Sequence, residues 1–478
     1  MKANKILNVI AFGMILSVVS SCGGNISSTT SNTTSTDSTS TSTTNSQSSM
    51  FPDVESASFS LNYNNISSIK NCAEGLLLIS KKSEFNSKIS YLNIAWGNQN
   101  GVLDDYNTLK QINQLTASDF EYEFKNNSLI PTEANKIRVE AYDKNNVLIE
   151  NASTDLTDFK KQEDKLYEFQ VISDQQVNSN NGCFYRRSKK TFEDIKENSP
   201  SSKVIVINGD VVDEATSANY DSFFDSYKSV FTDGKQKMTL GIGNHEFIKH
   251  DESNEFIASR TKEQLQSMYK ERLDLWKNKT NNKDLYFYEE INGSYFIYLG
   301  TTAYPETLDG NTKASCMLGE TQLKWLSNVL LEANKTKKPI FLFSHGSLRD
   351  TVSGSLRSLN QTWYGYSEEE EIKLREIIKL YPQILFFSAH SHWSFENENP
   401  YLITNNYPSF FNTAAIGYLW EGNGSGNIYN HGSYENGGAQ GLYLEVYKDQ
   451  IMIKGRQFEA SDKVSKYWHS AYQVVLPY

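Results

Sequence analysis

In the segment Val204-Ile205-Val206-Ile207-Asn208-Gly209-Asp210, four aliphatic residues are followed directly by Asn, Gly and Asp. A near-continuous hydrophobic run of this length is typical of a strand that is buried on both faces. Four further runs share this character: residues 169–172, 238–242, 340–343 and 384–387. A segment with helical periodicity, 321–333, precedes the fourth run. We therefore predict an α/β domain over residues 161–478.

Each of the five hydrophobic runs is followed by side chains that bind metal ions. These segments are Ser173-Asp174-Gln175-Gln176, Asn208 to Asp213, Gly243-Asn244-His245-Glu246, Ser344-His345 and Ala389-His390-Ser391-His392. The chain has seven histidines, and four of them lie in these segments. Open α/β sheets place ligands at the carboxyl ends of their strands, and Asp, Asn, Gln and His bind hard and borderline cations. The pattern predicts a metal site.

The ordered series resembles the signature of the calcineurin-like metallophosphoesterases: D-x-H, G-D-x-x-D, G-N-H-[DE], H and G-H-x-H. The resemblance covers about residues 162–458 and implies a layered sandwich of mixed β-sheets flanked by helices. It also implies two metal ions, divalent or mixed-valence, drawn from Mn, Fe, Zn and Ni. One ion would be held by Asp174, Gln176, Asp210 and His392, and the other by Asp210, Asn244, His345 and His390.

The same resemblance assigns catalytic roles to Asp210 and His245. Asp210 would bridge the two ions, which lower the pKa of a bridging water and clamp both oxygens of a phosphoryl displacement. His245 resembles the family histidine that is not a ligand, and it would donate to the phosphate or protonate the leaving alkoxide. The implied activity is hydrolysis of a phosphomonoester or phosphodiester by a dinuclear-metal enzyme.

Two departures from the family pattern leave an alternative open. Gln176 stands where the commonest motif has His, as in a D-x-Q variant of the family, and its amide oxygen is a weaker ligand. Ala389 replaces the usual Gly. The chain could therefore be a metal- or phosphate-binding surface protein with a weakened catalytic site. Arg349 and Arg357, in the polar loop after His345, are weaker candidates for contacts to phosphate.

The first fifty residues predict export and anchoring. A basic start and a short apolar stretch precede Val19-Ser20-Ser21-Cys22, which looks like a bacterial lipobox, so residues 1–21 are expected to be a lipoprotein signal peptide. Cys22 would be acylated and would anchor the protein to the cell membrane, outside the cytoplasm. Residues 22–50 are almost entirely small and polar, which predicts a flexible tether.

Residues 51–160 alternate between apolar and polar residues with period 2, separated by turn-rich stretches. Short strands at this spacing predict a small all-β sandwich, immunoglobulin- or fibronectin-like, ahead of the α/β domain. The formal net charge of −11 argues against a nucleic-acid ligand, because such proteins carry a basic footprint. The expected partners are a small phosphate ester and, through the lipid, a membrane.

Overall fold

The computed structural model describes residues 57–156, 165–302, 316–359, 361, 365–397, 399–420, 438–459 and 464–478. The predicted signal peptide, Cys22 and the predicted tether lie outside these residues. The described helices are α1 (Cys183–Asn198), α2 (Ser217–Lys228), α3 (Asn254–Ala258), α4 (Lys262–Thr280), α5 (Gly319–Ala333) and α6 (Glu368–Ile378), with 3-10 turns η1 (His245–Phe247), η2 (Asn334–Thr336) and η3 (Arg357–Leu359). Among the described residues, no helix combines the length and apolarity needed to cross a membrane.

The largest sheet has nine strands in the order β1-β2-β6-β20-β19-β18-β9-β10-β11. Their bounds are β1 (Phe59–Tyr63), β2 (Cys72–Lys81), β6 (Asp119–Leu129), β20 (Tyr467–Pro477), β19 (Gln450–Gln457), β18 (Gln440–Val446), β9 (Tyr167–Ile172), β10 (Ile205–Ile207) and β11 (Met238–Leu240). In the parallel part, Ile207 of β10 pairs with Ile172 of β9 and with Leu240 of β11. The register therefore brings the polar residues that follow these three strands out at one edge.

A second sheet has six strands in the order β12-β13-β14-β15-β17-β16. Their bounds are β12 (Phe287–Ile291), β13 (Ser294–Tyr298), β14 (Ile340–Ser344), β15 (Ile384–Ser388), β17 (Ser409–Asn412) and β16 (Tyr401–Leu402). Strands β14 and β15 are parallel, with Ser344 opposite Ser388. His345 and the His390–His392 segment consequently leave the sheet side by side.

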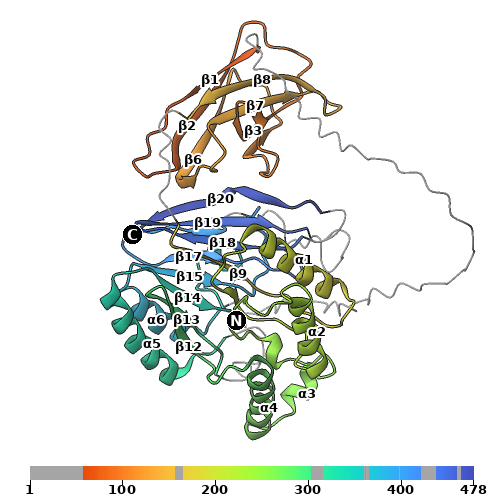
Figure 1. The fold of residues 1–478 in the computed structure, drawn as a ribbon, viewed down its shortest axis with the longest axis vertical. Helices are drawn as coiled ribbons and strands as arrows, with labels where there is room; N and C mark the ends of the chain where they lie inside the picture. The colour runs from red at the N-terminus through yellow and green to blue at the C-terminus, as the bar shows by residue number, and fades with distance from the viewer. Residues whose placement is uncertain are drawn as a thin grey trace, which may run out of the picture. The chain divides into compact units, whose positions relative to one another are not determined.

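The two sheets bury an aromatic-rich core between them, and helices cover their outer faces (Figure 1). Phe169 of β9 lies 4.8 Å from Phe296 of β13 and 4.9 Å from Phe341 of β14, measured between ring centroids. Residues of α1, α2 and α4 share a core with β10 and β11, and residues of α5 and α6 share one with β14 and β15. This layered α/β arrangement with mixed sheets confirms the predicted fold class.

Residues 57–156 contain strands and no helix among those the structure describes. A third sheet has the path β4-β3-β7-β8 with β5 paired to β3, and it shares one core with β1, β2 and β6. The bounds are β3 (Tyr91–Asn98), β4 (Gly101–Val102), β5 (Lys110–Ile112), β7 (Lys136–Tyr142) and β8 (Leu148–Asp155). Ser128 of β6 also pairs with Val474 of β20, so the first sheet continues from this region into the α/β region.

Each of the five hydrophobic runs forms a strand, as the sequence predicts. They correspond to β9, β10, β11, β14 and β15. The sequence pattern did not reveal that three of these strands lie in one sheet and two in the other. The polar residues that follow the five strands therefore gather where the two sheets meet, and not along the edge of one sheet.

Candidate metal centre

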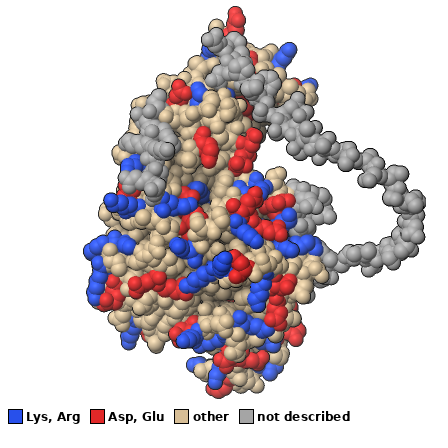
Figure 2. All heavy atoms as spheres, viewed as in Figure 1, with Lys and Arg blue, Asp and Glu red and all other residues tan. Residues whose placement is uncertain are grey.

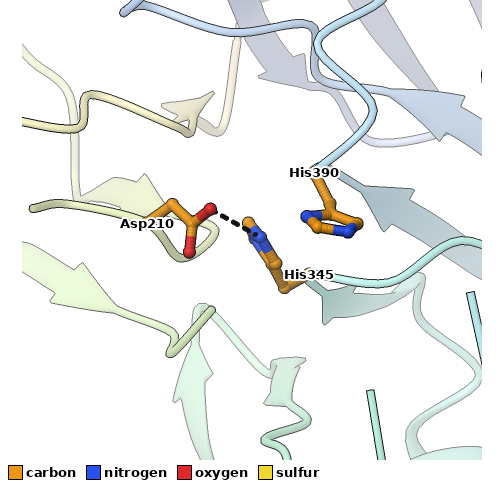
Figure 3. Close-up of side chains that lie close together, drawn as sticks. All are labelled: Asp210, His345 and His390. Atoms are coloured by element: carbon orange, nitrogen blue, oxygen red, sulfur yellow. Dashed lines mark ion pairs between the residues drawn. The ribbon is translucent and has the colours of Figure 1, made fainter. Parts of the chain in front are cut away.

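The carboxyl ends of the five strands bring buried Asp and His side chains together. Two groups have ligand atoms within 4.8 Å of one another: Asp210 with His345 and His390, and Asp174 with Asp210 and His392. Figure 3 shows the first group, in which Asp210 comes from the nine-stranded sheet and the histidines from the other. Asp210 belongs to both groups, which is the arrangement that a bridging ligand requires.

Each carboxylate of the two groups faces the Nε2 atom of a histidine. Oδ2 of Asp210 lies 3.1 Å from Nε2 of His345, and Oδ1 of Asp174 lies 3.1 Å from Nε2 of His392. The same Nε2 atom of His345 is 3.1 Å from Oδ1 of Asn244. These atoms converge, and the remaining carboxylate oxygens are held by the backbone: Asp210 Oδ1 accepts from the N–H of His245 and Asp174 Oδ2 from that of His390.

The converging oxygens suit metal ions. Asp174 and Asp210 are fully buried, and within the described part of the chain neither Asp174 Oδ1 nor Asp210 Oδ2 makes a hydrogen bond. Leaving a buried anionic oxygen without compensation costs several kcal/mol or more, whereas a cation at the convergence point would satisfy it. Carboxylate, imidazole and amide donors form a set that Mn, Fe, Zn and Ni accept. The residues present therefore fit a dinuclear centre.

Backbone strain is concentrated at the same positions. Five of the seven predicted ligands have left-handed φ values: Asp174 (54°), Gln176 (49°), Asp210 (54°), His390 (67°) and His392 (56°). Non-glycine residues in this region cost of order 1–3 kcal/mol each and persist where the surrounding structure enforces them. The strain turns each side chain sharply after its strand, which brings the donor atoms to one place.

Backbone carbonyls orient two of the imidazoles. Nδ1 of His345 lies 2.9 Å from the carbonyl oxygen of Asn208, and Nδ1 of His392 lies 3.1 Å from that of Tyr418. A carbonyl only accepts, so each Nδ1 carries a hydrogen, and in the neutral form of each ring Nε2 is the atom whose lone pair can bind a metal. Tyr418 also stacks on His392, with ring centroids 4.1 Å apart. Sequence reasoning missed Tyr418, because the loop after β17 has no motif that could have indicated it.

The electrostatics keep the carboxylates ionised and one imidazole neutral. Burial, together with the nearby His345, lowers the pKa of His390 to about 3. Burial alone would raise the pKa of Asp210, but His345 and His245 hold it well below its usual range. Neutral imidazole and charged carboxylate are the forms that bind metal ions.

Gln176 and Asn244 lie beside the two groups. Gln176 is buried, its backbone N–H donates to the carbonyl of Asp210 at 3.0 Å, and its Nε2 has no hydrogen-bond partner among the described residues. Asn244 precedes η1 with its Oδ1 toward His345, as given above. Gln176 and Asn244 therefore remain predicted ligands.

His245 belongs to neither metal-binding group, and the tight loops around it are organised by Glu246. The buried carboxylate of Glu246 accepts from the N–H groups of Asp210, Val211 and Gly243. Gly243 allows this approach, because a Cβ there would lie 2.1 Å from Asp210 Oδ1. These contacts make Glu246 a hydrogen-bonding residue that holds the loops, and not a member of either metal-binding group.

The two arginines after His345 are engaged in ion pairs away from the groups. Arg349 Nη1 lies 2.6 Å from Oε2 of Glu371 on α6, and Arg357 Nε lies 2.5 Å from Oδ2 of Asp350. Arg349 also donates to the carbonyl of Tyr366. These contacts account for both side chains without a phosphate.

Comparisons with known proteins give one family. Residues 169–394 match the family model of the calcineurin-like phosphoesterases, a range that contains all seven predicted ligands. None of the curated proteins compared with the chain matches it.

Several solved structures are similar to part of the chain at low identity. A dimetal phosphatase from Danio rerio is 12% identical, with 66% of this chain and 100% of that chain covered and a TM-score of 0.42. GAP50, the anchor in the inner membrane complex of Plasmodium, is 12% identical, with coverage of 66% and 90% and a TM-score of 0.36. The family match covers the residues of both metal-binding groups, so residues 169–394 of this chain are similar to the calcineurin-like phosphoesterases.

Proposed function

We propose that the protein is a metal-dependent hydrolase of small phosphomonoesters or phosphodiesters that works outside the cytoplasm, anchored by a lipid on Cys22. The observation that carries the catalytic part is the position of Asp210 in both buried metal-binding groups. A single aspartate shared by two sites holds two cations close together, as a dinuclear phosphoesterase requires.

The described residues suggest how each ion would be held. Asp174, Gln176 and His392 would complete one site, and Asn244, His345 and His390 the other, with Asp210 common to both. When bound, two such ions supply positive charge for the phosphate and lower the pKa of coordinated water. Neutral imidazoles and amides keep the protein's contribution to the site from becoming too negative for an anionic substrate.

We assign His245 to the leaving group. Its Nδ1 lies 2.7 Å from the carbonyl oxygen of Asp213, which fixes the hydrogen on Nδ1 and leaves Nε2 for the substrate. Its side chain is partly exposed, at 20%, whereas the five Asp and His residues of the metal-binding groups are buried. The step we assign to it is transfer of the Nε2 proton from the doubly protonated imidazolium to the leaving alkoxide, which leaves His245 neutral with its hydrogen on Nδ1.

The surface suits a small ester better than a nucleic acid. On the face seen in Figure 2, Lys and Arg side chains are interspersed with Asp and Glu side chains. The formal net charge is −11. A positive field is then expected only where metal ions sit, which favours a compact phosphate over a long polyanion.

A metal-by-substrate screen tests the proposal. The purified chain would be stripped with a chelator and reloaded with Mn, Fe, Zn or Ni. Each form would then be assayed on a nitrophenyl monoester, a bis-nitrophenyl diester, nucleotides, cyclic nucleotides and a phosphopeptide. We expect hydrolysis that depends on added metal and disappears in Asp210→Asn. Tight binding of two ions without turnover of any ester would instead favour a metal- or phosphate-binding surface protein.

A further inference from the structure

A second histidine, His250, contacts Asp213, the residue whose backbone carbonyl is hydrogen-bonded to His245. His250 follows η1, and 48% of its side chain is exposed. Its Nε2 atom lies 3.2 Å from Oδ2 of Asp213, an aspartate that is 8% exposed. Nδ2 of Asn178 donates to the same Oδ2 at 3.4 Å. The Asp213 carboxylate is therefore held from two sides, and one of the two donors is at the surface.

On its other side, Asp213 touches His245 through its backbone. The carbonyl oxygen of Asp213 is 2.7 Å from Nδ1 of His245, whereas its Oδ1 is 3.6 Å from that atom, beyond hydrogen-bond range. The carboxylate of Asp213 is thus bonded to His250 and Asn178, and the carbonyl is bonded to His245. One residue links the exposed histidine to the histidine that we place at the leaving group.

Besides the hydrogen bond from the N–H of Ala215 to the carbonyl of Ile248 at 2.9 Å, long hydrogen bonds hold the backbone at Asp213 and His250. The backbone N–H of His250 donates to Oε2 of Glu214 at 3.3 Å, and the backbone N–H of Asp213 donates to the carbonyl of Val177 at 3.3 Å. Both are long hydrogen bonds. Loss of the His250 side chain would let the Asp213 carboxylate turn toward water and would loosen the carbonyl that orients His245.

We propose that His250 is a positioning residue for His245, acting through Asp213. The proposal rests on the proposed function, since it concerns the group that protonates the leaving oxygen. Small displacements of a catalytic group cost up to about 10²-fold in rate. We expect about tenfold for His250→Ala, less than the loss expected for removal of His245 itself, because Asn178 still holds the carboxylate.

Kinetics on two ester types test this role. The full chain, His250→Ala, His250→Gln and the control Lys249→Ala would be assayed on an alkyl phosphate and on a nitrophenyl phosphate. Gln keeps an N–H donor, and Lys249 is a loop neighbour whose ammonium lies 3.8 Å from Glu271. We expect His250→Ala to lower kcat about tenfold on the alkyl ester and less on the nitrophenyl ester. KM and metal content should not change, His250→Gln should recover most of the loss, and Lys249→Ala should match the parent.

An imidazole NMR signal gives a readout that does not depend on turnover. The Nδ1–H proton of His245, protected by its hydrogen bond to Asp213, should be visible in the zinc-loaded parent and in His250→Gln, and exchange-broadened in His250→Ala. Equal losses on both esters, loss of metal, or an unchanged signal and unchanged rates in His250→Ala would each overturn the proposal. If the parent hydrolyses no ester, the proposed function fails, while the NMR comparison still decides whether His250 positions His245.

Discussion

The Nε2 atom of His345 lies 3.1 Å from Oδ2 of Asp210, although the histidine follows a strand of the six-stranded sheet and the aspartate a strand of the nine-stranded sheet. The candidate metal centre therefore joins the two sheets at their shared edge. A ligand that binds the folded form and not the unfolded form raises the free energy of unfolding. The increase is about 4 kcal/mol when the ligand concentration is a thousand times the dissociation constant. Metal ions should accordingly stabilise the contact between the sheets as well as the site.

Asp210→Asn should lower both metal content and turnover, because the substitution removes the charge that both groups share. The metal-dependent rise in melting temperature should shrink with it. Elemental analysis and thermal unfolding with and without chelator would measure these effects. Asp233→Asn, which makes the same charge change at an exposed position, is the control. Two ions bound with unchanged affinity in Asp210→Asn would remove Asp210 from the bridging role.

His245→Ala should keep both ions and lose turnover. General acid catalysis contributes about 10²–10⁴-fold, which sets the expected loss on an alkyl ester. The rate of hydrolysis of a nitrophenyl ester should fall less, because its leaving group needs little protonation. Metal analysis beside rates on both esters would decide the matter. Loss of metal from the variant, or full activity on the alkyl ester, would show that the assigned role is wrong.

Gln176 can be tested by two replacements. If its amide oxygen binds an ion, Gln176→Ala should weaken that ion by something like 10–100-fold, as perturbed metal shells do. Gln176→His should keep activity and bind one ion more tightly, because imidazole is the stronger donor. Metal titrations would compare both variants with the parent and with Gln111→Ala, an exposed position on β5. Identical affinities in all four proteins would exclude Gln176 as a ligand.

The contact between His250 and Asp213 should appear in the pH dependence of stability. The hydrogen bond to Asp213 raises the pKa of His250 against its partial burial, and Glu214 and Asp251 add to the rise. A raised pKa stabilises the folded chain below the unfolded value of about 6.5, and this contribution disappears as pH rises through the folded value.

His250→Ala should therefore melt below the parent at about pH 5.5 and converge with it toward about pH 9. The half-exposed pair should contribute no more than about 1 kcal/mol. Melting curves at matched metal concentration across this range would measure the difference. Lys249→Ala should differ from the parent by a constant amount, and a constant difference for His250→Ala as well would contradict the pairing.

The proposed anchoring would depend on Cys22, which lies outside the described residues. Cys22→Ser should release the protein from membranes or block its processing, because the acylated thiol would be lost. Labelling of the membrane fraction with a fatty-acid probe would measure this. Cys183→Ser, which replaces a partly buried thiol on α1, should keep the label. Equal labelling of Cys22→Ser and the parent would rule out lipidation at this position.

Local sequence patterns predicted the individual elements well. The turn at Asn292-Gly293 joins β12 to β13 with Ile291 opposite Ser294, and both turn residues have positive φ values, 52° and 81°. Glu368 to Glu371 form the first turn of α6, capped by Ser367. The hydrophobic patterns of strands and helices repeat every few residues, and a tight turn is specified by its two central residues. Each signal can therefore be recognised without knowing what the element packs against.

From the amino-acid sequence alone we could predict the five strands and the helix before the fourth of them. We could also identify the Asp, Asn, Gln and His residues that follow the strands. Only the tertiary structure decided that these strands divide between two sheets, that Tyr418 stacks on His392, and that His250 reaches Asp213. Hydrophobic periodicity records whether a residue is buried in its own element. The choice of partner depends on contacts between residues far apart in the chain, and on left-handed turns such as those at Asp174 and Asp210, whose cost is met only once both sheets are assembled.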